Sequence, residues 1–133
     1  MTIKDEIKKS FICMVSENEE KMTISSLCQR LNISRKTFYK YYNDKYDLIH
    51  QIIYDDIFEY LTYLSKIEGV KADDSIFVLT SMYTRIYENR EFYKKLNLME
   101  TNLFLDIFYE ETYKLNKSLF TKEGKEEAEW EYQ

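Results

Sequence analysis

Apolar positions recur along most of this chain with the period of an α-helix. The first stripe predicts a helix over about residues 2–15, and a polar stretch at 16–21 ends it. Further stripes predict helices over about 44–65, 73–88, 91–99 and 101–119. The expected apolar faces consist of Ile3, Ile7, Phe11 and Met14 in the first helix; Ile49, Ile53, Ile57, Leu61 and Leu64 in the helix at 44–65; and Ile76, Leu79, Tyr83, Ile86 and Tyr87 in the helix at 73–88.

Two short helices with a tight turn are expected between the first helix and the long one. Thr23 and Ser34 are residues that cap helix starts, and each follows an apolar residue suited to a hydrophobic staple. Between them, Asn32 tolerates the left-handed backbone that ends a helix. Two capped helices so close in sequence must cross, which predicts a helix-turn-helix.

Composition supports an all-α fold. The chain has 133 residues, no proline and only two glycines, whereas β proteins need frequent turn residues. We expect an N-terminal three-helix helix-turn-helix domain over 1–47, joined through the long fourth helix to a small helical regulatory or dimerisation domain over 48–133. No run of about eighteen apolar residues and no signal peptide is present, so a cytoplasmic protein is expected.

Few residues are suited to catalysis or metal binding. His50 is the only histidine, which leaves few ways to build a catalytic triad or a histidine metal site. Cys13 and Cys28 lack metal-ligand spacing and fall on apolar helix faces, so two buried reduced thiols are expected. We therefore predict neither an enzyme nor a metal site, and no cofactor.

Charge is distributed unevenly between the two halves. The whole chain has a formal net charge of −5, with +2 in residues 1–50 and −7 in residues 51–133. Residues 21–45 contain six Lys or Arg against one acid, Asp44. A locally basic helix-turn-helix in an acidic chain indicates DNA binding, because clustered positive charge is what a phosphate backbone attracts.

The second short helix carries the candidate DNA-reading face. On a helical wheel Phe38 and Tyr42 point toward the core. Arg and Lys are suited to guanine edges, while Tyr and Thr hydroxyls are suited to phosphates. Lys45, in the first turn of the next helix, is placed to hold a phosphate. Lys36, Thr37 and Lys40 point away from the core, and Arg35, Tyr39 and Tyr41 flank them. A basic face that is merely solvated stays the alternative.

Residues 23–48 resemble the DNA-binding domain of the tetracycline-repressor family of bacterial regulators. The resemblance rests on Ile33-Ser34, on Thr37-Phe38-Tyr39, on the aromatic Tyr42, and on Lys45 with Leu48, and it extends over residues 1 to about 65. It implies a transcriptional repressor that binds a palindromic operator as a homodimer under small-molecule control. It also implies DNA contacts by Thr23, Ser25, Arg35, Lys36, Thr37, Tyr39, Lys40, Tyr41 and Lys45.

The sequence departs from that family in two regions. In the helix-turn-helix, Asn32 stands where the family commonly has glycine, Cys28 where it has alanine, and Lys36 where it has glycine. Only about 68 residues follow residue 65, so we expect the two closing helices of such proteins to be missing, and with them the usual dimer contact.

Aromatic residues in the second half suggest a ligand pocket. The candidates are Tyr83, Tyr87, Tyr93, Phe108 and Tyr113. Tyrosine at helical spacing is more often a core or interface residue, because it buries a large area with one polar tip, so that alternative stays open. For the whole protein, the alternative to a DNA-binding regulator is an interaction module that docks a partner regulator through the same fold.

Overall fold

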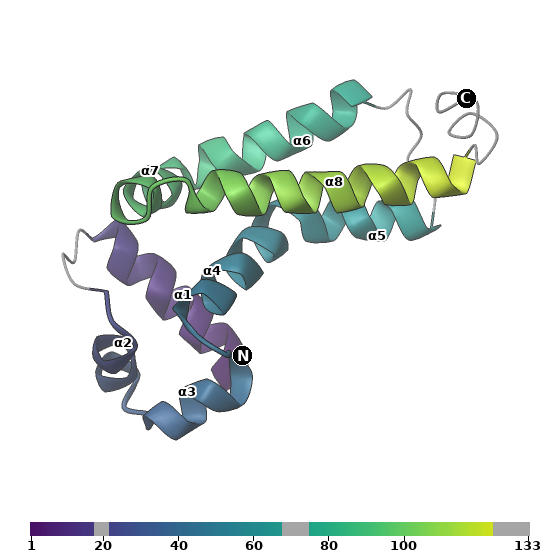
Figure 1. Ribbon diagram of the computed structural model, residues 1–133. Helices are drawn as coiled ribbons and strands as arrows, with labels where there is room; N and C mark the ends of the chain where they lie inside the picture. The colour runs from purple at the N-terminus through teal and green to yellow at the C-terminus, as the bar shows by residue number, and fades with distance from the viewer. Residues whose placement is uncertain (18–21, 68–74, 124–133) are drawn as a thin grey trace. The chain divides into compact units, whose positions relative to one another are not determined.

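The computed structural model describes residues 1–17, 22–67 and 75–123, and all regular structure in these ranges is helical (Figure 1). The all-α prediction is therefore confirmed for the described part of the chain. The elements are α1 (Ile3–Ser16), α2 (Ile24–Leu31), α3 (Arg35–Tyr41), α4 (Lys45–Ile53), the π-helical segment η1 (Tyr54–Phe58), α5 (Glu59–Ile67), α6 (Ser75–Glu88), α7 (Arg90–Met99) and α8 (Leu103–Glu123).

The chain divides into two compact units. The first consists of Met1–Ile52 and Arg90–Thr101, and the second of Ile53–Asn89 and Asn102–Gln133. A single boundary after residue 47 had been expected. The structure differs because α7 belongs to the first unit, although its neighbours on both sides in the chain belong to the second.

The first unit is built around α1. Ile7, Phe11 and Met14 of its predicted stripe are buried, whereas Ile3 at the start of the helix is 42% exposed. The return of α7 completes this core, because Phe92 packs edge-on against Phe11 with ring centroids 6.4 Å apart. Lys95 of α7 also donates a hydrogen bond to the Ser16 carbonyl at the end of α1.

The long helix expected over 44–65 is interrupted by a π-helical turn. Residues 45–67 form α4, η1 and α5 in succession. Ile49, Ile53, Ile57 and Leu61 of the predicted stripe are buried, so the apolar face continues through the turn. Periodicity alone gave no signal for the π-helix, since one wider turn shifts the stripe only slightly.

The second unit packs η1 and α5 against α6 and α8. Phe58 of η1 lies 5.5 Å, centroid to centroid, from Phe108 of α8. Asp56 of η1 also binds residues at the end of α6 through hydrogen bonds. Its carboxylate accepts hydrogen bonds from Arg85 Nη2 at 2.7 Å and from Asn89 Nδ2 at 3.0 Å, and its carbonyl accepts from Arg85 Nε at 3.1 Å.

The buried face of α6 differs from the predicted one. Val78 and Met82 are its buried residues. Of the five residues expected on the apolar face, only Ile86 is half-buried. The other four are exposed: Ile76 by 78%, Leu79 by 65%, Tyr83 by 70% and Tyr87 by 56%. The prediction failed because this helix has two apolar faces, and the larger stripe is the outer one.

Candidate nucleic-acid interface

The turn between α2 and α3 is closed by Asn32. Its φ of 54° and ψ of 46° lie in the left-handed region, as its residue type predicted. The following amide of Ile33 donates to the Cys28 carbonyl at 3.0 Å, and the Asn32 amide donates to Gln29 at 3.2 Å. These two bonds form a Schellman motif, which satisfies the last carbonyls of α2 and turns the chain toward α3.

Both helices of the motif begin at the predicted caps. The Thr23 hydroxyl accepts from the Ser26 amide at 3.0 Å, and Ser26 Oγ accepts from the Thr23 amide at 3.1 Å, a capping box. At the start of α3, Ser34 Oγ accepts from the Thr37 amide at 3.1 Å and lies 2.9 Å from the Thr37 hydroxyl. The Thr23 and Thr37 hydroxyls predicted to meet DNA therefore also fix the helix starts.

One side of α3 is anchored in the core of the first unit. Phe38 is fully buried and Tyr42, the cap residue after the helix, is 1% exposed. The Tyr42 hydroxyl donates to the Lys4 carbonyl at 3.1 Å, which ties the end of α3 to α1. With this side fixed, the opposite side of α3 must face solvent.

The solvent side of α3 carries its positive charge. Arg35, Lys36 and Lys40 are exposed, and none of the three forms an ion pair with another described residue. Lys40 Nζ lies 5.7 Å from the centroid of the Tyr41 ring, and Tyr39 is 44% exposed. The positive charges of α3 thus lie on its exposed side, whereas Thr37 and Tyr41 of the same helix are half-buried. Ser25 on α2 is exposed as well.

Two cations of the motif are paired with acids outside it. Lys45 Nζ lies 3.1 Å from a carboxylate oxygen of Glu100, which follows α7, and Arg30 lies 3.2 Å from Glu17, which follows α1. Sequence reasoning missed both acids, because each comes from another part of the first unit. In the structure the positive charge of Lys45 is therefore compensated by Glu100.

Cys28 is a buried residue of α2, the first helix of the motif. It is 3% exposed, and burial raises the pKa of its thiol, opposed by the positive charge of Arg35. Both Cys13 and Cys28 are free thiols, as expected, although Cys13 is only half-buried. Cys28 therefore stays protonated and acts as a small apolar core residue.

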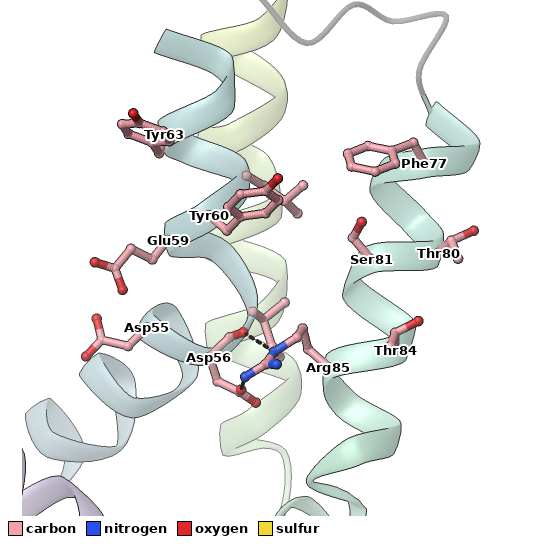
Figure 2. Close-up of a pocket in the computed structure, with 12 residues that line it drawn as sticks. Asp55, Asp56, Glu59, Tyr60, Tyr63, Phe77, Thr80, Ser81, Thr84 and Arg85 are labelled. Atoms are coloured by element: carbon pink, nitrogen blue, oxygen red, sulfur yellow. Dashed lines mark hydrogen bonds and ion pairs between the residues drawn. The ribbon is translucent and has the colours of Figure 1, made fainter. Parts of the chain in front are cut away.

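The five aromatic residues predicted to line a ligand pocket are not gathered in one place. Tyr93 is buried in the first unit, while the other four belong to the second. Tyr83, Tyr87 and Tyr113 are more than half exposed, and Phe108 packs on Phe58. A groove does exist in the second unit, but none of the five lines it (Figure 2). Its walls contain Tyr60, Tyr63 and Phe77, and sequence reasoning did not select these residues.

The capped turn, the anchored second helix and its exposed basic face define a helix-turn-helix DNA-binding domain. A family model described as the helix-turn-helix domain of resolvase matches residues 18–45, the segment that contains the motif. A comparison with curated proteins gives no match to this chain. Among the described residues, no helix combines the length and apolar character needed to span a bilayer.

Proposed function

We propose that this protein is a transcriptional regulator of the tetracycline-repressor type, in which α3 reads the major groove of its operator. One observation carries the proposal: Phe38 of α3 and its C-cap residue Tyr42 are buried on one side, and Arg35, Lys36 and Lys40 are exposed on the other. A helix anchored in this way presents its cations as a rigid set, which suits it to base edges and phosphates.

The cations are assigned different tasks. Arg35, in the first turn of α3, contacts a base edge, because N-terminal residues of a recognition helix reach furthest into the groove. Lys45 leaves Glu100 to hold a phosphate, which contributes affinity but no sequence information. Thr23, Ser25, Thr37, Tyr39 and Tyr41 add contacts to the sugar-phosphate backbone.

Fluorescence anisotropy tests this division of tasks on DNA from upstream of the protein's own gene and on a scrambled duplex. Lys45→Ala should weaken binding to both and reduce the salt slope by about 0.9. Arg35→Ala should lose roughly 1–3 kcal/mol of discrimination between them. Lys94→Ala removes an equal charge from α7 and serves as the control. Equal losses on both duplexes for Arg35→Ala and Lys45→Ala would refute the assignment.

A homodimer is part of the proposal. One recognition helix reads too few base pairs for a specific site, and two half-sites about 34–36 Å apart require two subunits. The outer face of α6 supports self-association, since Ile76, Leu79, Tyr83 and Tyr87 recur at helical spacing and are each more than half exposed. The mass of the protein in solution, alone and with its DNA, tests this part.

A second candidate function is an interaction module that docks a partner regulator. The pairing of Lys45 with Glu100 and of Arg30 with Glu17 favours it, because both pairs reduce the free positive charge of the motif. DNA binding with a steep salt dependence would exclude this candidate. A flat salt dependence on every duplex would support it against the regulator.

A further inference from the structure

The outer face of α6 carries no charged side chain. The segment from Ser75 to Thr84 contains neither acid nor base, although 32% of the whole chain is charged. Thr80 and Thr84 lie between the four apolar residues of this face and are exposed as well. A surface helix normally presents charged and polar side chains to water, so this face has the composition of a surface that is covered.

The outer face lies opposite the side of α6 that the fold buries. Val78 and Met82 are buried, and at 3.6 residues per turn Thr80 points about half a turn away from both. Figure 2 shows Phe77 extending from α6 toward α5, whereas Thr80 and Thr84 extend from the other side of the helix. A helix that is apolar on opposite sides is suited to burial on both. Among the described residues, the fold of one copy buries only the side of Val78 and Met82.

The exposed area is sufficient for a dimer interface. The four apolar residues of the outer face are each more than half exposed. Because an aromatic side chain buries roughly 150–250 Å², and Ile or Leu somewhat less, the four together expose about 500 Å². Two copies that cover this face on each other bury about 1,000 Å², which is the area that a specific protein–protein interface needs.

The chemistry of the face fits a second copy of the chain. Its apolar side chains and hydroxyls complement themselves, and they offer no charge by which a basic or acidic partner would be recognised. Residues 51–133 have a formal net charge of −7. Two such copies repel each other least where both surfaces are uncharged, and α6 provides that surface.

We propose that two copies of this chain pair through α6, outer face to outer face and with the two helices antiparallel. The middle of the face falls between Thr80 and Tyr83, so a two-fold axis there places Ile76 beside the partner's Tyr87. Glu88 then lies near the N-terminal end of the partner's α6, where the helix dipole favours a negative charge. The interface specifies the homodimer named in the proposed function and rests on that part of it.

The mass of the full chain in solution tests the interface. Sedimentation equilibrium without DNA should give twice the mass of one chain. Tyr83→Lys should weaken the dimer about a hundredfold or more, because both copies lose a central aromatic contact and gain a like charge. Tyr109→Lys changes an equally exposed tyrosine on α8 and should leave the dimer within about twofold. A monomeric unmodified chain overturns the proposal, and so does a dimer that Tyr109→Lys dissociates and Tyr83→Lys does not.

Cross-linking tests the direction of the two helices. In a background with Cys13→Ala and Cys28→Ala, a short bismaleimide should link Ile76→Cys chains to Tyr87→Cys chains in a mixture. Neither variant should link to itself, because antiparallel packing separates the two equivalent positions by about 16 Å along the helices. Self-linking of Ile76→Cys and of Tyr87→Cys, each on its own, would show parallel packing and overturn the proposed arrangement.

DNA binding separates this interface from the proposed function. A dimer that binds DNA but forms no cross-link through α6 overturns the interface and leaves the regulator standing. A dimer that is cross-linked through α6 but binds no DNA refutes the proposed function and leaves the interface standing.

Discussion

The ion pair between Lys45 and Glu100 makes a sharp prediction about DNA affinity. Its nitrogen and oxygen are 3.1 Å apart, and the two side chains are 25% and 27% exposed. Fully exposed pairs contribute about 0.2–1 kcal/mol. Because both side chains are largely buried, we place this pair near the upper end, at about 1 kcal/mol. Lys45 must forgo that energy whenever it contacts a phosphate instead.

Glu100→Gln should therefore raise DNA affinity, because the competing carboxylate is gone. A gain of about 1 kcal/mol corresponds to roughly a fivefold lower Kd. The gain should disappear in the Lys45→Ala background, since no cation remains there to be released. Fluorescence anisotropy of all four proteins in a double-mutant cycle, at one fixed salt concentration, measures the coupling directly.

Glu91→Gln is the matched control, because it removes an exposed carboxylate from the same segment without touching an ion pair between described residues. It should change the affinity by less than about twofold. The reasoning is refuted if Glu100→Gln improves binding equally with and without Lys45. That result would mean that Glu100 acts by general repulsion of DNA. No improvement in either background would mean that Lys45 does not meet a phosphate.

Two further predictions concern the stability of the motif. Asn32→Ala should lower the free energy of unfolding in urea by about 1 kcal/mol, because alanine disfavours the left-handed backbone, whereas Asn32→Gly should be nearly neutral. The raised pKa of Cys28 predicts that the folded protein holds the thiol proton more tightly than the unfolded chain. Its stabilising effect is complete below the unfolded thiol pKa and is lost as pH rises through the folded pKa. Cys28→Ala should remove that alkaline loss, and pH-dependent urea titrations measure it.

Features set by near neighbours in sequence were predictable. The caps at Thr23 and Ser34 and the left-handed Asn32 each depend on groups within about four residues, so residue type was sufficient. The burial of Phe38 in α3 and of Tyr42 at its C-cap followed from their spacing of four residues, which places both on one side of a helix. The all-helical fold followed from the same periodicity and the scarcity of glycine and proline.

Features that depend on distant residues were not predictable. Periodicity identified α6 but not its buried side, since Val78 and Met82 are fewer than the apolar residues of the outer face. The groove depends on the clamp between Asp56 and Arg85, which are 29 positions apart, and on the π-helical turn that carries Asp56. The predicted ligand pocket consisted of aromatic residues chosen by their helical spacing, whereas the residues that line the groove do not follow such a period.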